Sequence, residues 1–337
     1  MESLSFGQKQ ILSWRSIILA VIATLGFGYL AFGGIDANEI LQAMSRVSAW
    51  TIAGALALFL IATTLRVMRW WLLLRRFHSN LPVSACVSPF LLGIAANDLL
   101  PVRIGDLVKM FANRKAIQVL PSTRLGTIVM ERIFDIISIL LIFFLGALYL
   151  DIPSLELLKS AAYAILMISL ITLFGLLFFS KAAENWIFFF LELKPFRKIT
   201  LTKKSKEWTS QFFETFRKLS YKNICMLFLL SCAIWSVEGT MALVIALGID
   251  PSVGALGPYL SLACGALSNF LPSAPGQIGT LDYFLQLGVL GYGMSKTSAI
   301  AFALLVHLIF LGFSVVVAGI LIRRKSTWKI FRNLRNS

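Results

Sequence analysis

The residues with the clearest chemical potential are charged side chains inside long apolar stretches. Arg103, Asp106 and Lys109 follow one another at intervals of three, which places them near one face of a helix. An arginine guanidinium matches a phosphate with two parallel hydrogen bonds. The trio therefore indicates a phosphate-binding site. A mutual ion pair between Arg103 and Asp106 is the alternative.

A second group of charges is Glu131, Arg132 and Asp135. Its two carboxylates are four residues apart, so they share a helix face. There they would form ion pairs with Arg103 or bind a cationic headgroup. Because an apolar run follows, we place these residues at the start of a helix, where acidic side chains also suit the helix dipole.

Two more ionisable residues, Glu238 and His307, lie deep in apolar runs. Such groups are costly inside a membrane and are often functional. They indicate either a proton- or cation-linked role or a buried pair. Four arginines near position 70 are interpreted as anchors at the membrane surface rather than ligands: Arg66, Arg69, Arg75 and Arg76.

A proline- and glycine-rich break interrupts the apolar stretch 251–281. It contains Pro272, Pro275, Gly276 and Gly279, which free backbone amides where a helix begins again. Amides at a helix start can hold an anion. A simple kink is the alternative.

Composition fixes the broad class of the chain. Of 337 residues, 58% are hydrophobic and 14% are charged, against about 25% charged residues in soluble domains. The long, unalternated apolar runs indicate helices that cross a membrane rather than an outer-membrane barrel. With four scattered cysteines, two histidines and no nucleotide-binding loop, we expect no metal site, no cofactor and no enzymatic activity.

The apolar runs predict an all-α polytopic protein with six full spans and two re-entrant helical hairpins. Eight to ten full spans are the alternative. Prolines inside the two remaining apolar stretches argue for re-entrance, because lipid cannot satisfy free backbone groups. The six spans cover residues 16–35, 47–65, 133–150, 160–180, 223–249 and 297–322.

Basic residues predict the orientation. With both termini in the cytoplasm, all but three of the 31 lysines and arginines lie on the cytoplasmic side, the exceptions being Arg46, Lys159 and Lys296. This asymmetry explains the net charge of +15 without a nucleic-acid partner.

Two similar segments indicate an internal repeat. Gly93, Asn97 and a Leu-Pro pair are matched by Gly265, Asn269 and a second Leu-Pro pair, with the asparagines 172 residues apart. Three spans separate the hairpins, so the repeat is expected to be inverted, as in many transporters. A chance match is the alternative. The expected divisions are a first repeat 1–152 with hairpin 79–131, a second repeat 153–325 with hairpin 251–295, and a cytoplasmic tail 326–337.

The cytoplasmic loop 181–222 is basic, and Trp208, Phe212, Phe216 and Leu219 recur in it at helical spacing. This pattern predicts an amphipathic helix on anionic lipid headgroups, with a solvated loop as the alternative.

Three blocks of the sequence resemble the lysylphosphatidylglycerol synthase transmembrane family. They are Asn97-Asp-Leu-Leu-Pro-Val-Arg-Ile-Gly-Asp106, Glu131-Arg-Ile-Phe-Asp135 and Leu271-Pro-Ser-Ala-Pro-Gly-Gln-Ile-Gly-Thr-Leu-Asp282. The family usually has glutamate where Asp106 and Asp282 stand, and glycine where Gln277 stands. The resemblance implies a lipid-handling membrane protein without the soluble domain that synthesises aminoacylated lipid.

We therefore expect a bacterial inner-membrane lipid translocase of the flippase type, working by alternating access. The alternative is a non-transporting accessory of a lipid- or polysaccharide-modifying enzyme. Expected partners are anionic membrane lipids, with a homo-oligomer or such an enzyme as further possibilities. The candidate substrate-binding residues are Asn97, Arg103, Asp106, Lys109, Glu131, Arg132, Asp135, Glu238, Asn269, Pro272, Pro275, Gly276, Gly279 and Asp282.

Overall fold

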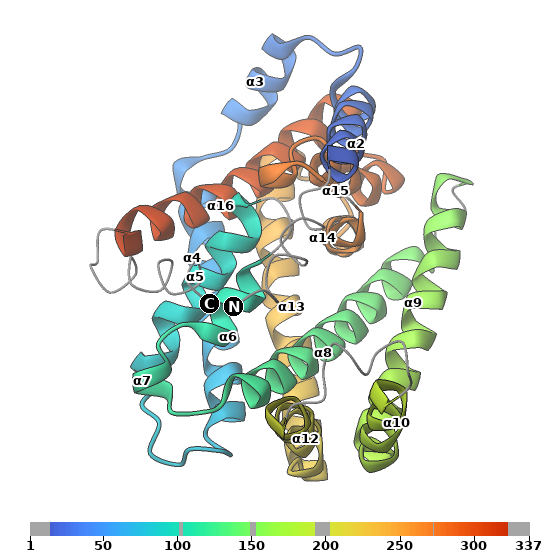
Figure 1. The fold of residues 1–337 in the computed structure, drawn as a ribbon. Helices are drawn as coiled ribbons and strands as arrows, with labels where there is room; N and C mark the ends of the chain where they lie inside the picture. Colours follow the sequence, from blue (N-terminus) through green and yellow to red (C-terminus); the bar gives the residue numbers. More distant parts are fainter. Residues whose placement is uncertain (1–13, 101–103, 149–152, 193–202, 272, 323–337) are drawn as a thin grey trace.

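The computed structural model describes residues 14–100, 104–148, 153–192, 203–271 and 273–322, and every regular element in these ranges is helical (Figure 1). We call residues 14–148 the first half of the chain and residues 153–322 the second half. The first half contains α2 (Trp14–Phe32), α3 (Ala37–Ser45), α4 (Ala49–Leu74), α5 (Val83–Leu99), α6 (Gly105–Phe111), α7 (Arg114–Ile117) and α8 (Pro121–Ala147).

The second half follows a similar order of long and short helices. It contains α9 (Pro153–Phe178), α10 (Ser180–Glu192), α12 (Lys203–Arg217), α13 (Tyr221–Ile249), α14 (Leu256–Leu267), η1 (Ser268–Phe270), η2 (Pro275–Gln277), α15 (Thr280–Gly291) and α16 (Lys296–Ile322).

Four of the described helices are long and apolar enough to cross a membrane: α4, α9, α13 and α16. Shorter apolar helices are found over residues 21–32 and 83–99. Helix α8 has 27 residues, about 40 Å at the usual rise, but it carries several charges. Large apolar side chains are widely exposed, among them Ile22, Leu60, Ile171 and Val316, as expected where lipid rather than water surrounds a protein. The chain is therefore a multi-pass membrane protein.

The long central helices α4 and α13 begin in the same way. Ser48 caps α4 by accepting a hydrogen bond from the amide of Thr51, and Ser220 caps α13 by accepting one from the amide of Asn223. A serine hydroxyl before the first turn satisfies an amide that has no partner within the helix. The two helices begin 172 residues apart, the same spacing that separates Asn97 from Asn269.

Two helical hairpins, α5–α6 and α14–α15, provide the breaks that the sequence predicts. Leu100 and Leu271 end their helical segments in extended conformations, which is the conformation that a following proline imposes. Gly105 then lets α6 approach α5 closely, because a Cβ at this position would lie 1.9 Å from the carbonyl oxygen of Gly93.

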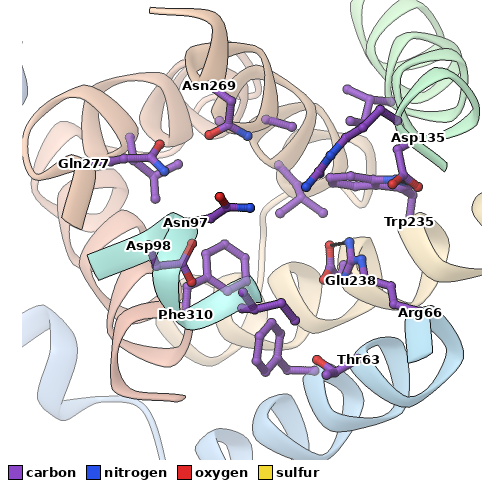
Figure 2. Close-up of a pocket in the computed structure, with 18 of the residues that line it drawn as sticks. Thr63, Arg66, Asn97, Asp98, Asp135, Trp235, Glu238, Asn269, Gln277 and Phe310 are labelled. Atoms are coloured by element: carbon purple, nitrogen blue, oxygen red, sulfur yellow. Dashed lines mark hydrogen bonds and ion pairs between the residues drawn. The ribbon is translucent and has the colours of Figure 1, made fainter. Parts of the chain in front are cut away.

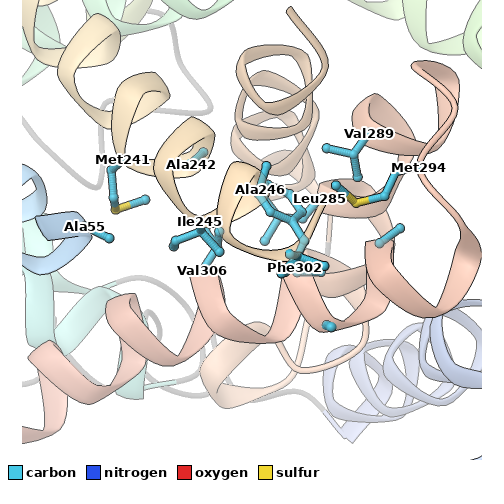
Figure 3. Close-up of a cluster of buried hydrophobic side chains, with 14 of the residues drawn as sticks. Ala55, Met241, Ala242, Ile245, Ala246, Leu285, Val289, Met294, Phe302 and Val306 are labelled. Carbon is cyan, nitrogen blue, oxygen red and sulfur yellow. The ribbon is translucent and has the colours of Figure 1, made fainter. Parts of the chain in front are cut away.

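The helix contacts repeat between the two halves. Helix α5 packs against α16 and α14 packs against α8; likewise α3 contacts α16 and α12 contacts α8. Helices α4 and α13 pack on each other. A buried apolar cluster joins α4, α13, α15 and α16 through side chains such as Met241, Leu285 and Phe302 (Figure 3).

The amphipathic helix expected in the loop 181–222 is present as α12. Its buried side chains Phe213 and Phe216 pack with Met130 and Phe134 of α8, and Arg217 binds Glu184 of α10 at 2.7 Å. Phe213 and Phe216 thus attach α12 to the protein, while Trp208, Phe212 and Leu219 are only partly buried. Contact of α12 with lipid headgroups stays a prediction.

Two expected boundaries are wrong: the end of the first hairpin at residue 131 and the start of the third span at residue 133. The first hairpin does not extend to residue 131, because α8 already begins at Pro121, a residue well suited to a first helical turn. Glu131, Arg132 and Asp135 consequently lie in the middle of α8 and not at its start. The helix dipole acts within the first turn, so it does not explain these acidic residues.

Candidate functional site

A pocket of about 490 Å³ lies where the two hairpins meet the long helices α4, α8, α13 and α16. Four cationic and five acidic side chains line it: Arg66, Arg69, Lys109, Arg132, Asp98, Asp106, Glu131, Asp135 and Glu238. The rest of the lining is largely apolar and includes Phe59, Ile136, Ile139, Leu262, Leu285 and Phe310. The pocket is therefore amphipathic, with many charges for a site inside a membrane protein.

Arg69 stands at the centre of the charged lining and is 2% exposed. Its guanidinium donates to both carboxylate oxygens of Asp135, at 2.6 and 2.9 Å, and to Glu131 at 3.3 Å. It also donates to the hydroxyl of Ser231 at 2.5 Å. Trp235 donates its indole N–H to Asp135 at 3.1 Å. These contacts fix α4, α8 and α13 to one another.

Lys109 extends this network onto the hairpin helix α6. Its ammonium group forms an ion pair with Glu131 and lies 4.6 Å from the ring centre of Trp70 and 4.2 Å from that of Phe90. A cation over aromatic faces is stabilised by the ring quadrupole. Lys109 is therefore held by three partners.

Arg66 and Glu238 form a two-pronged ion pair across the contact between α4 and α13; Nη2 of Arg66 donates to Oε2 of Glu238 at 2.7 Å (Figure 2). The guanidinium also lies 5.1 Å from the ring centre of Trp235. The two charged residues are 172 residues apart, so they occupy corresponding positions of the two helices.

The hairpins are each held by one basic residue of a long helix. In the first half, Arg132 of α8 donates to Asp106 at 2.8 and 3.2 Å, 26 residues away in sequence. In the second half, His307 of α16 contacts Asp282 at 2.8 Å, 25 residues away. Arg132 and Asp106 are 53% and 35% exposed, whereas His307 and Asp282 are 8% and 1% exposed.

The broken segment of the second hairpin is tied to these residues by its backbone. Gly279 has a φ of +80°, a conformation that glycine adopts without strain, and its amide donates to Oδ2 of Asp282 at 2.8 Å. The carbonyl oxygen of Gly276 lies 2.7 Å from Nε2 of His307. Pro275 begins the short helix η2.

Amide side chains line the other side of the pocket. Asn97, Asn269 and Gln277 lie there with Asp98 (Figure 2). Asn97 accepts a hydrogen bond from the amide of Gly105 at 2.8 Å. Among the described residues, Oε1 of Gln277 has no hydrogen-bond partner, and neither does Oγ1 of Thr63. Buried polar atoms of this kind are suited to accept hydrogen bonds from a ligand.

The structure brings most of the predicted site residues to one place. The residues that line the pocket are Asn97, Asp106, Lys109, Glu131, Arg132, Asp135, Glu238, Asn269 and Gly276. Asp282 contacts the lining residue His307, and Gly279 binds Asp282. Arg103 and Pro272 lie outside the described residues, so the phosphate-binding role of Arg103 stays a prediction. The alternative, an ion pair between Arg103 and Asp106, stays a prediction as well; Asp106 binds Arg132.

Sequence reasoning missed the role of two arginines. Arg66 and Arg69 were expected to anchor the helix at the membrane surface, but both line the pocket and bind carboxylates. A buried charge requires a partner, so the carboxylates of α8 and α13 determine that these two arginines point into the protein. The spacing of the repeat is the signal that would have found Arg66, since it places this arginine opposite Glu238.

Fold and pocket together define a class: helical, multi-pass membrane proteins with a charged pocket between two broken helical hairpins. The model of the family described as the lysylphosphatidylglycerol synthase TM region matches residues 17–319. The chain belongs to this family, which confirms the resemblance of its three sequence blocks.

Two archaeal proteins are also similar. A UPF0104 membrane protein of Methanocaldococcus jannaschii is 26% identical over 66% of this chain and 90% of its own length. A UPF0104 membrane protein of Pyrococcus horikoshii is 23% identical over 91% of this chain and 96% of its own length. The bacterial inner membrane thus stays a prediction.

Proposed function

We propose that this protein moves membrane lipids between the two leaflets of a bilayer. The observation that carries the proposal is the amphipathic pocket, whose charged and amide side chains suit a lipid headgroup while its apolar lining suits the adjoining hydrocarbon. The membership of a family named after lipid synthesis supports a lipid-related role.

Arg132 and Asp106 are the side chains we assign to the headgroup. Their ion pair is half-exposed, whereas the pairs around Arg69 are buried. Because the pair is partly open to the pocket, a headgroup phosphate can reach the guanidinium of Arg132 and replace Asp106 there. In the same proposal, Asp106 accepts hydrogen bonds from a cationic or hydroxylated part of the headgroup.

The two halves supply the movement in this proposal. Corresponding helices start at corresponding positions and make corresponding contacts, which supports an inverted repeat with six full spans and two re-entrant hairpins. In such proteins one repeat rocks against the other and exposes a central site alternately to each side.

The test is reconstitution of the purified protein into liposomes that contain a fluorescent phospholipid. A reagent that bleaches only the outer leaflet should bleach nearly all the lipid when the protein is active, and only the outer fraction without it. Arg132→Gln should reduce the rate strongly, since an amide cannot hold a phosphate with a charged fork. The matched control, Arg114→Gln at an exposed position of helix α7, should retain the wild-type rate.

Wild-type protein that leaves the inner leaflet unbleached would contradict the proposal and favour the accessory role. Equal rates for both variants would remove Arg132 from the headgroup site.

The proposed topology gives a separate prediction. In a variant without the four native cysteines, Lys115→Cys should be protected from a membrane-impermeant maleimide in intact cells, while Asn38→Cys should react. Both positions are exposed, and the basic-residue asymmetry places α7 in the cytoplasm and the start of α3 outside. Reaction of Lys115→Cys from outside would reverse the orientation.

A further inference from the structure

His307 lies between two hydrogen-bond acceptors inside the second half. Its Nε2 atom is 2.7 Å from the carbonyl oxygen of Gly276, and its Nδ1 atom is 2.8 Å from Oδ1 of Asp282. A carbonyl oxygen only accepts hydrogen bonds, so Nε2 must carry a proton. Whether Nδ1 also carries a proton decides the net charge of the pair that His307 forms with Asp282.

The pair His307–Asp282 can bind one further proton, which would lie between Nδ1 and the carboxylate of Asp282. With it, the imidazolium donates to both acceptors and the pair with the carboxylate is neutral. Without it, either Nδ1 presents a lone pair to the carboxylate, or the other tautomer presents a lone pair to the carbonyl of Gly276. Deprotonation therefore breaks one of the two contacts of His307.

These contacts hold the break in the second hairpin. Asp282 also accepts from the amide of Gly279 at 2.8 Å, so the ring links α16 to the backbone within η2 and, through Asp282, to the backbone just after it. In the first half the corresponding contact uses Arg132, whose guanidinium keeps its proton at any physiological pH. Of these two corresponding contacts, the one in the second half is made by a side chain that can release its proton near neutral pH.

Other charged groups surround His307 at a greater distance or are already bound. Asp98 of α5 acts on it electrostatically and is bound by Ser314. Glu238 of α13 is held by Arg66. Glu39 of α3 contacts Thr297, ten residues before His307 and so about 15 Å along α16. Lys296, at the start of α16, binds the carbonyl oxygen of Gly33. Asp282 is therefore the immediate partner of the ring.

We propose that the His307–Asp282 pair is a proton-binding site that couples lipid movement to a proton gradient. This proposal rests on the translocation proposed above. In each cycle the Nδ1–H bond breaks, the proton passes to solvent in the pocket that His307 lines, and the hairpin loses one tie to α16. Binding of a proton from the other side restores the imidazolium and both contacts.

The coupling predicts a thermodynamic result. With one proton moved per lipid and the membrane potential clamped at zero, a gradient of one pH unit should shift the steady-state ratio of fluorescent lipid between leaflets by about tenfold. A pH-sensitive dye inside the liposomes should record proton flux that starts only when translocatable lipid is present. His307→Gln should abolish both the shift and the flux, while His78→Gln, at the other histidine of the chain, should preserve both.

The local contact is tested separately by hydrogen exchange on the same reconstituted protein. After correction for the intrinsic rate, the amide of Gly279 should lose protection as the pH rises in the wild type and in His78→Gln. In His307→Gln its protection should not depend on pH. This measurement does not require lipid transport. The pH dependence in the wild type tests the proton-binding contact even if His307→Gln does not fold.

The outcomes separate the two proposals. Lipid movement without a shift of the leaflet ratio by a pH gradient, or a shift that survives in His307→Gln, overturns proton coupling and leaves translocation intact. Absence of lipid movement under every condition overturns translocation and coupling together. Exchange at Gly279 that is independent of pH in the wild type overturns the proton-binding contact itself.

Discussion

Replacing Arg69 by methionine should destabilise the protein by about 3–5 kcal/mol, because Asp135 then stays buried without its cation. Methionine fills a similar space, so the loss of charge dominates. Unfolding of the purified protein in detergent, followed by tryptophan fluorescence against denaturant, measures the change. The matched control is Arg75→Met, six residues after Arg69 and directly after the end of α4 at an exposed position, which should change stability by less than about 0.5 kcal/mol.

A double substitution separates the charge effect from general damage. Arg69→Met together with Asp135→Leu removes both partners, so its cost should be clearly smaller than the sum of the two single costs. Residues in one ion-pair network typically couple by about 0.5–3 kcal/mol. Strictly additive losses would show that the contact between Arg69 and Asp135 contributes nothing to stability.

The second large effect is expected at the pair Arg66–Glu238. Arg66→Glu places two carboxylates opposite each other between α4 and α13, where Glu238 is 4% exposed, and should greatly reduce the yield of folded protein. The reciprocal variant, Arg66→Glu with Glu238→Arg, restores opposite charges at the same place. It should recover most of the yield in a fluorescence-detected size-exclusion assay.

A swapped variant as poor as Arg66→Glu alone would contradict this account. The contact with Trp235 is the specific reason for an incomplete recovery, since the arginine would then start from α13 and approach that ring differently.

The sequence predicts the elements far better than the contacts between them. Uncharged runs located α13 and α16 to within two residues, because an apolar run of that length has few alternatives to a membrane helix. The start of α8 was missed, since its charged residues lower the hydropathy of a helix that buries Arg124, Glu131 and Asp135 within the protein. Hydropathy records the charge of a residue and not its partners.

In the site, too, the residues were predicted better than the contacts between them. Asp106 and Lys109 were found by their spacing, but their partners, Arg132 and Glu131, belong to another helix. Only the tertiary fold selects these partners. Arg69 also has no charged counterpart in the second half: Met241 stands 172 residues after it, in the apolar cluster that joins α4, α13, α15 and α16.

Two identical halves could not have formed the contact between Arg66 and Glu238. In a symmetric dimer of the first half alone, Arg66 would face Arg66, and like charges buried at one place repel. The present contact therefore requires two different sequences in one molecule, α4 with its arginine and α13 with its glutamate. If the chain arose by duplication of a half-length gene, at least one of these two charges was acquired after the copies had become separate. From then on neither copy was able to replace the other.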